Sequence, residues 1–380
     1  MFMTAFIKNS AVVHRIVCAV LFLIFTFLYV YSYQVDILAA TQHVLSGGVT
    51  HYDRTVGAIL ITAVLFCLHL VIYGVSRLNG VFHALTYLPS LLLVGLLTDV
   101  DTLLLYGRYP LFWLWFFPLL MLVYGWVIWI GRQYESVQRK RHNFRLRPLW
   151  LNLLTMLLMF LMTGCIGSND KVLHYRAHME HAYFTHRSLP AIETGRRDAV
   201  TDSSLTLLRI WALTEQKQLG SRLFTFPLAG GSEAMLPNGR SVRLLMVPEA
   251  KLYKALGGVV WPKMTPKKYL TSLHHIGKAT PMAHDWLLCA HLLDGDIDAF
   301  VRDLPRYYPI NAQLPKHYRE ALILYAHQRH QPVIVYREAV MDADYEDFRL
   351  LRTQIKEKKA KKSDLKSRYG KTFWYYYETL

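Results

Sequence analysis

Five long apolar runs near the amino terminus constrain this chain more than any other feature. They contain no Asp, Glu, Lys or Arg and cover residues 16–33, 56–75, 80–97, 110–130 and 149–166. About 18 such residues are enough to cross roughly 30 Å of hydrocarbon as a helix. Because a helix satisfies its own backbone hydrogen bonds in lipid, we predict about five transmembrane helices in a transmembrane domain of residues 1–166.

The composition changes after the fifth run. Hydrophobic residues make up 53% of the whole chain, yet residues 166–380 contain 32 basic and 22 acidic residues, a net charge of +10. We therefore expect a soluble domain over residues 167–380 whose surface suits anionic membrane lipid. We expect no nucleic-acid partner, since no basic and aromatic recognition motif accompanies the charge.

Basic residues predict how the spans are oriented. They gather before the first run, after the second and after the fourth, at Lys8, Arg15, Arg77, Arg132, Arg139, Lys140, Arg141, Arg145 and Arg147. Loops rich in Lys and Arg stay in the cytoplasm. We predict a bacterial inner (cytoplasmic) membrane protein with a cytoplasmic amino terminus. Five crossings then place the carboxyl-terminal domain in the periplasm.

The region after the fifth run has the spacing of helices with one buried face. Helices are predicted over about 170–185 and 202–216, then as a helical hairpin over about 286–304, and again over 318–325. Residues 219–247 predict a long connection with one short strand at 242–246, and a long final helix begins near Tyr345. The predicted fold class is all-α, with an αα-hairpin, repeat-like soluble domain.

Within that region, Trp286, Leu293, Gly295 and Phe300 resemble positions of a tetratricopeptide repeat, although no 34-residue period recurs along the chain. A wider resemblance is to uncharacterised bacterial membrane proteins with several spans and a repeat-like helical tail. It is carried by the segments LGSRLFTFP at 219–227, DWLLCAHLLDGDIDAF at 285–300, LPKHYREALILY at 314–325 and YGKTFWYYY at 369–377. The resemblance implies the architecture and supplies no catalytic residue.

A histidine group is the main candidate metal site. His174, His178 and His181 recur at i, i+4 and i+7 and so share one helical face. Neutral imidazoles at such spacing can bind zinc when a further ligand such as Glu180 or Asp170 completes the set. The alternative is that these histidines line a groove or face solvent, because histidine is common in this region.

Two further patterns suggest chemistry. LMTGC at 161–165 resembles a lipobox, which makes Cys165 a candidate lipidation site after cleavage. Chance in an apolar segment rich in Leu and Met is the competing explanation. Asp99 and Asp101 follow the third run, where paired acidic residues serve as a base or metal ligands in membrane glycosyltransferases, although two aspartates at a helix end are also common.

The sequence favours a membrane-anchored module that binds a protein or peptide partner in the periplasm, without catalytic residues or a cofactor. Repeat-like helical stacks supply extended concave surfaces for such partners. The alternative is a membrane-embedded enzyme, similar to a glycosyltransferase, or a transporter component. Polar residues facing inward from several spans would distinguish that class. His69, His83 and Asn152 are the main ones, and we interpret each as tolerated near a helix end or interface.

Overall fold

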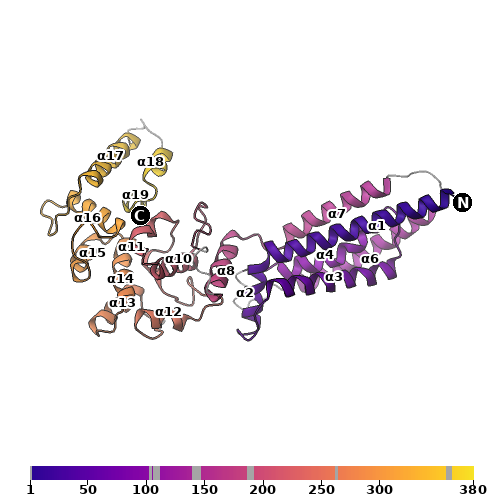
Figure 1. Cartoon of the computed structure of the whole chain (residues 1–380), viewed down its shortest axis with the longest axis horizontal. Helices are drawn as coiled ribbons and strands as arrows, with labels where there is room; N and C mark the ends of the chain where they lie inside the picture. The colour runs from indigo at the N-terminus through magenta and orange to yellow at the C-terminus, as the bar shows by residue number, and fades with distance from the viewer. Residues whose placement is uncertain are drawn as a thin grey trace. The chain divides into compact units, whose positions relative to one another are not determined.

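The computed structural model describes residues 2–101, 105, 112–138, 147–185, 192–261, 264–356 and 362–380. The chain forms two compact units, Met1–Ala177 and His178–Leu380. We call the first the membrane unit and the second the soluble unit. Helix α8 (Lys171–Phe184) begins in the first and ends in the second. Figure 1 shows the course of the chain through both units.

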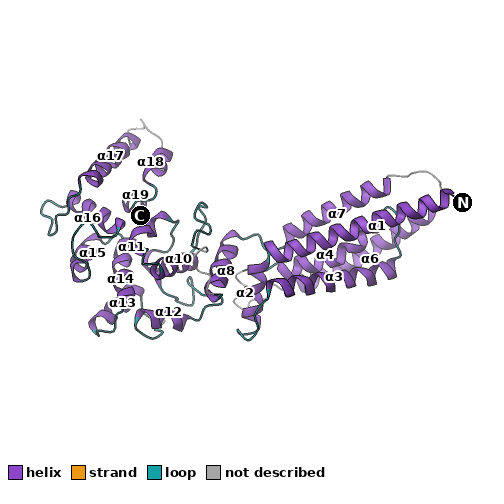
Figure 2. Ribbon diagram, in the orientation of Figure 1, coloured by secondary structure: helices purple, strands orange, loops and turns teal. Residues whose placement is uncertain are grey.

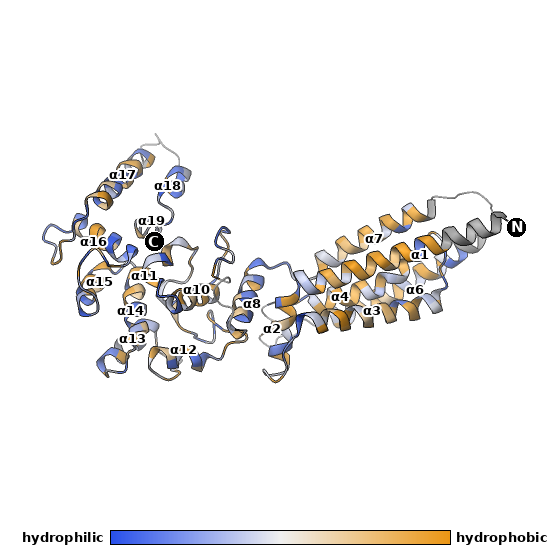
Figure 3. Cartoon of the chain, viewed as in Figure 1, coloured by the Kyte–Doolittle hydropathy of each residue, from blue (hydrophilic) through white to orange (hydrophobic). Residues whose placement is uncertain are grey.

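Apolar helices build the membrane unit. In chain order they are α1 (Phe2–Leu28), the π-helical turn η1 (Tyr29–Tyr33), α2 (Val35–Leu45), α3 (Arg54–Ser76), the 3₁₀ turn η2 (His83–Tyr87), α4 (Leu88–Thr98), α6 (Phe112–Gln138) and α7 (Arg147–Ile166). Among the described residues, four helical segments are long and apolar enough to cross a membrane: Val12–Tyr33, Arg54–Ser76, Phe112–Tyr134 and Leu149–Ile166. Figure 3 shows the apolar colouring of α1, α3, α4, α6 and α7. The four segments agree with four of the five predicted runs.

The third predicted run does not form one long helix. Pro89 lies in the first turn of α4, where its missing N–H costs nothing, and the residues before it form η2 instead of a continuous helix. At 1.5 Å per α-helical and 2.0 Å per 3₁₀ residue, η2 and α4 together extend roughly 26 Å. The segment is therefore slightly shorter than the hydrocarbon layer, and the prediction of a full-length helix here is wrong.

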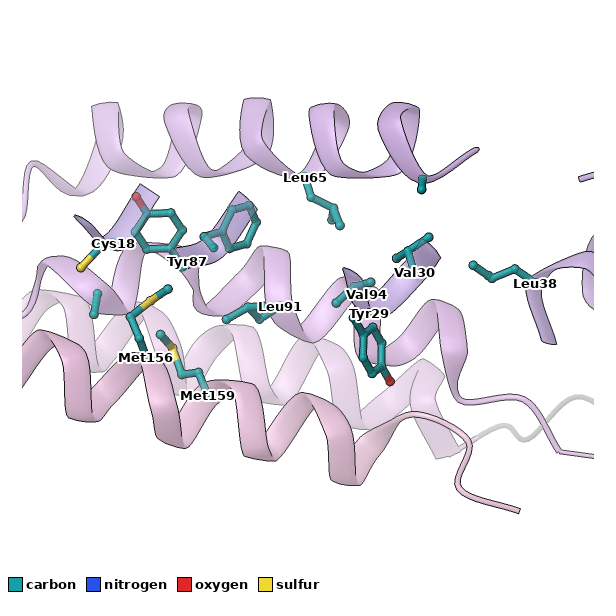
Figure 4. Close-up of a cluster of buried hydrophobic side chains, with 13 residues drawn as sticks. Cys18, Tyr29, Val30, Leu38, Leu65, Tyr87, Leu91, Val94, Met156 and Met159 are labelled. Carbon is teal, nitrogen blue, oxygen red and sulfur yellow. The ribbon is translucent and has the colours of Figure 1, made fainter. Parts of the chain in front are cut away.

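The core of the membrane unit lies between α1, α3, α4 and α7. Its members, several of which Figure 4 labels, include Cys18, Phe22, Leu65, Tyr87, Leu91, Val94, Met156 and Met159. A Cβ on Gly95 of α4 would lie 3.1 Å from the side chain of Ile166, so the absence of a side chain lets α4 approach α7 closely. Ser90 of α4 donates a hydrogen bond of 2.8 Å to the carbonyl of Leu65 in α3. Small residues and such polar contacts hold helices together in lipid.

The soluble unit is also built from helices, and Figure 2 draws no strand in the described residues. Its longer helices after α8 are α10 (Ser203–Glu215), α12 (Glu249–Leu256), α13 (Pro266–His275), α14 (Pro281–Leu293), α15 (Ile297–Asp303), α16 (Lys316–Gln328), α17 (Ala339–Lys356), α18 (Lys362–Tyr369) and α19 (Phe373–Thr379). Short turns join them: α11 (Leu219–Arg222), η3 (Leu223–Thr225), η4 (Gly231–Met235) and η5 (Leu304–Arg306). The all-α prediction is confirmed, and the helices expected near 170–185, 202–216 and 286–304 are present.

The strand predicted at 242–246 is wrong for an identifiable reason. The buried carboxylate of Glu180 accepts hydrogen bonds from the backbone nitrogens of Leu245 at 2.6 Å and Met246 at 2.7 Å. The Val247 nitrogen lies 3.3 Å away from the same oxygen. A side chain therefore takes the backbone donors that a strand would offer to its neighbour. The expected long final helix is likewise divided into α17, α18 and α19.

Helix α14 is the central helix of the soluble unit, and α11, α12, α13, α15 and η4 pack around it. Trp286 is fully buried and donates a hydrogen bond of 2.8 Å to Thr214 in α10. Asp285 accepts hydrogen bonds from the hydroxyls of Tyr308 at 2.7 Å and Tyr318 at 2.9 Å. Burial raises the pKa of Asp285, and the two tyrosine hydrogen bonds oppose that increase.

Candidate functional site

Three histidines from three different elements meet inside the membrane unit. His14 lies on α1, His69 on α3 and His83 in η2, and their exposed fractions are 5%, 3% and 2%. The ring centroid of His83 lies 6.0 Å from that of His14 and 6.2 Å from that of His69. Ionisable side chains within membrane segments are costly to bury and commonly mark substrate, ion or proton pathways. We call this group the histidine cluster.

Tyrosine rings enclose the histidine cluster. Tyr73 and Tyr87 stand almost perpendicular to the ring of His83, with centroids 5.4 Å and 5.9 Å away. Tyr87 also stacks on His69 at a centroid distance of 3.6 Å and an interplanar angle of 7°. The aromatic rings thus pack against two of the imidazoles. Their negative potential favours a cation on a neighbouring ring.

Hydrogen bonding assigns the proton on His83. Its Nδ1 lies 3.1 Å from the carbonyl oxygen of Leu78. A carbonyl only accepts hydrogen bonds, so Nδ1 is the protonated nitrogen of the neutral ring, and Nε2 carries the lone pair. Nε2 is buried and has no hydrogen-bond partner among the described residues. The arrangement thus leaves an unprotonated imidazole nitrogen without a hydrogen-bond partner, among the described residues, inside an apolar bundle.

The other two imidazoles are held by neighbouring polar groups. His69 Nδ1 lies 3.2 Å from the hydroxyl of Thr86, which itself donates to the carbonyl of His83 at 2.7 Å. His14 Nε2 lies 3.2 Å from the backbone carbonyl of Asn79. These hydrogen bonds fix the positions of the three rings. None of the hydrogen bonds involves Nε2 of His83.

Basic and polar side chains gather next to the cluster. The side-chain oxygen of Asn79 accepts hydrogen bonds from the Arg15 guanidinium and from the Tyr73 hydroxyl, the latter at 2.6 Å. The Arg15 guanidinium also lies 5.4 Å from the centre of the Tyr73 ring. Arg132 of α6 donates to the carbonyl of Ser76 at 2.6 Å. Polar contacts thus link the end of α3 and the residues after it to the middle of α1 and to α6.

The sequence identified two residues of this cluster and predicted them to be tolerated near a helix end or interface. In the structure His69 and His83 are buried in the bundle, with ring centroids 6.2 Å apart. Asn152 is fully buried as well, but it lies on α7 and bonds to Gly80 and Ala84. His14 was missed because it precedes the apolar run that begins at residue 16. Its place beside Arg15, before a span, was the available signal.

The predicted metal and lipidation residues lie elsewhere. His174, His178 and His181 are all on α8, and His174 Nε2 lies 2.9 Å from the carbonyl of Ser168. Within the described part of the chain, no three His, Cys, Asp or Glu side chains are placed to hold a metal ion. Cys165 is exposed near the end of α7. Metal binding on α8 and lipidation of Cys165 stay predictions.

One residue of the predicted acidic pair, Asp99, forms a hydrogen bond within the bundle. Asp99 accepts a hydrogen bond from the indole nitrogen of Trp113 in α6. Asp101 follows two residues later as an exposed side chain. The structure therefore gives Asp99 a role in attaching α6, and it adds nothing to the enzyme hypothesis.

Comparison with protein-family models gives a match in the soluble unit. Residues 262–379 match the model of a family of unknown function, DUF6057. The comparison with curated proteins found no match, and neither did the comparison with solved structures. The matched segment covers α13 to α19 and excludes the histidine cluster. It agrees with the expectation of an uncharacterised family and identifies no reaction.

Proposed function

We propose that this protein is a component of a membrane transporter and that the histidine cluster carries protons within its bundle. The proposal rests on one observation. Nε2 of His83 has no hydrogen-bond partner among the described residues, and His83 is buried between two further imidazoles from separate helices. Imidazole is the side chain that gains and loses a proton near neutral pH. Chains of such groups form proton relays in membrane transporters.

The proposed proton transfer needs only the imidazole rings of the histidine cluster and the proton that they exchange. Nε2 of His83 accepts a proton and forms an imidazolium, with Nδ1 still bound to the carbonyl of Leu78. The ring centroids of Tyr73 and Tyr87 lie 5.4 and 5.9 Å from that of His83, within the range at which aromatic rings attract a cation. Loss of the same proton restores the neutral ring. Centroids 6.0 and 6.2 Å away put His14 and His69 within reach of one bridging water molecule.

Proton flux into proteoliposomes tests this proposal. Full-length protein is reconstituted around a pH-sensitive dye, and a potassium diffusion potential drives protons inward. We expect wild-type vesicles to change pH faster than empty vesicles, and His83→Gln to lose that difference. His275→Gln, which changes an exposed histidine of α13, is the matched control and should behave as wild type. Wild-type flux equal to that of empty vesicles contradicts the proposal.

The proposed orientation has a cytoplasmic amino terminus and a periplasmic soluble unit in a bacterial inner membrane. Support comes from the segment 80–98, whose two ends bond to α7. Asn152 contacts Gly80 at one end, and Ser168 N donates to the carbonyl of Thr98 at the other. The 15 residues from Asn152 to the end of α7 at Ile166 correspond to roughly 22 Å of helix, so η2 and α4 run beside most of α7. That course supports a fifth crossing and a periplasmic soluble unit.

A second candidate function is binding of a protein or peptide partner by the soluble unit. One observation favours it: the connection between α16 and α17 exposes Val333 by 87% and Val335 by 57%. Apolar side chains presented together on a surface commonly mark an interaction site. A photo-crosslinking amino acid at residue 333 should capture one reproducible partner in cells. The same group at the exposed residue 200 should not.

A further inference from the structure

The connection between α12 and α13 presents three apolar side chains to solvent. Val259, Val260 and Trp261 have exposed fractions of 70%, 41% and 55%. We call these three residues the apolar tip. Isolated exposed apolar residues are normal on a protein surface, but a consecutive run that ends in Trp is not explained by folding alone.

Two glycines project the apolar tip outward. Gly257 ends α12 with φ of 99°, a conformation that other residues rarely adopt, and a Cβ there would collide with the carbonyl of Lys278. A Cβ on Gly258 would collide with the hydroxyl of Tyr269. The backbone therefore passes tightly between α12 and α13 at this point, and the next three side chains have no core to enter.

Hydrogen bonds keep the apolar tip in place. The hydroxyl of Tyr269 donates to the carbonyl of Val259 at 3.0 Å, and the nitrogen of Met264 donates to the carbonyl of Trp261 at 3.3 Å. The connection between α13 and α14 lies next to it, because the backbone nitrogen of Thr280 donates to the carbonyl of Leu256 at 3.3 Å. That second connection exposes Ile276 by 67%. The exposed apolar residues are thus held on a fixed framework and lose little freedom on binding.

Positive charge dominates the two helices and the connections next to the apolar tip in the chain. Residues 249–280 contain six lysines and one acidic residue, Glu249. Four of these lysines are exposed on the described surface: Lys251, Lys254, Lys268 and Lys278. Lys267 is instead paired with Asp294 at 2.5 Å. Each exposed lysine near an anionic bilayer adds electrostatic attraction that salt screens.

We propose that the apolar tip binds the surface of an anionic lipid bilayer. Trp261 sits at the level of the head groups, where indole rings accumulate, with Val259 and Val260 below it. The exposed lysines pair with lipid phosphates. The apolar helices of the same chain keep a bilayer at high local concentration, which favours even a weak contact. This inference does not depend on the histidine cluster.

An environment-sensitive fluorophore on the full-length protein tests the proposal. The exposed Cys67 and Cys165 are changed to Ser, and a single label is attached at Val260→Cys. The protein is reconstituted in vesicles of phosphatidylcholine alone or with phosphatidylglycerol. We expect blue-shifted emission, quenched by spin-labelled lipid, in the anionic vesicles, and a weaker response at high salt.

Two controls make the result specific. A label at Val333→Cys reports a more exposed valine, 87% against 41% for Val260, whose own segment, 329–338, contains two arginines but no lysine and no Trp, and it should stay unquenched. The double change Lys254→Gln and Lys278→Gln should reduce quenching at residue 260 to the level in neutral vesicles. Trp261→Ser should reduce it as well. Emission at residue 260 that matches emission at residue 333 overturns the proposal. Emission at residue 260 that is the same in neutral and anionic vesicles overturns it as well.

Discussion

Asn152 of α7 accepts a hydrogen bond of 2.7 Å from the backbone nitrogen of Ala84 in η2. Its amide nitrogen donates to the carbonyl of Gly80 at 2.9 Å, so both ends of one fully buried side chain bind the segment that precedes α4. In lipid there is no water to replace these bonds. Asn152 therefore sets where η2 packs against α7 and, through η2, where His83 lies.

Asn152→Leu should destabilise the membrane unit. The change leaves the Ala84 N–H buried without its acceptor, which costs about 1–3 kcal/mol. We expect a lower unfolding temperature for the full-length protein in detergent. Thr155→Val on the same helix is the control, since the hydroxyl of the half-buried Thr155 donates to the carbonyl of Leu151 within its own helix. Equal unfolding temperatures for Asn152→Leu and the wild type would show that η2 finds other partners.

Glu320→Ala should release the carboxyl-terminal helix α19. The buried Glu320 carboxylate accepts from the backbone nitrogen of Phe373 at 2.7 Å and lies 2.8 Å from Nδ1 of His317. Removing it strands two buried groups, and loss of one partner of such a pair costs about 3–5 kcal/mol. We expect earlier proteolytic cleavage between α18 and α19. Glu346→Ala, at a half-exposed glutamate of α17, should leave the cleavage pattern unchanged.

Much of the fold was predictable because lipid imposes a simple rule. A charge-free run of 18 residues has few alternatives to a helix, and the runs at 56–75 and 149–166 became α3 and α7. The error at 80–97 came from the length and hydropathy of the run. Pro89 lies in the first turn of α4, so that helix begins near Pro89 and not at residue 80. The false strand at 242–246 had a different source, because the competing acceptor, Glu180, lies more than 60 residues earlier in the chain.

The histidine cluster was only partly predictable. His69 and His83 are visible as polar residues in apolar runs, but their spacing along the chain does not reveal that the rings lie about 6 Å apart. That proximity depends on the antiparallel packing of α3 against η2. The protonation of His83 at Nδ1, which leaves Nε2 without a proton, depends further on a single contact with the backbone carbonyl of Leu78. Neither contact leaves a motif in the sequence.

Acid should loosen α13 and α14. His284 stacks on both His274 and Tyr307. Burial lowers the pKa of His284, and burial together with the neighbouring His284 lowers that of His274. The unfolded chain, with histidine pKa near 6.5, then binds more protons than the folded chain, so stability falls as pH drops below about 6.5. Hydrogen-exchange protection of α13 and α14 should decrease between pH 7.5 and 5.5.

Two variants isolate this effect. His284→Phe keeps the stacking and removes one titrating ring, so the loss of protection in acid should be smaller than in the wild type. His275→Gln changes an exposed neighbour and should show the wild-type pH dependence. A wild-type protection profile that is the same at both pH values, after correction for intrinsic exchange, would contradict the prediction.

Fusions to alkaline phosphatase, which is active only in the periplasm, decide whether η2 and α4 cross the membrane. With five crossings and a cytoplasmic amino terminus, fusions after residues 48, 105 and 200 should be active, and fusions after residues 78 and 140 inactive. If η2 and α4 return to the side they left, the fusion after residue 105 becomes inactive, residue 140 becomes active and residue 200 becomes inactive. Activity is normalised to the amount of fusion protein on a blot. The basic loops at Arg77 and around residue 140 favour the first pattern, because an excess of Lys and Arg keeps short loops in the cytoplasm.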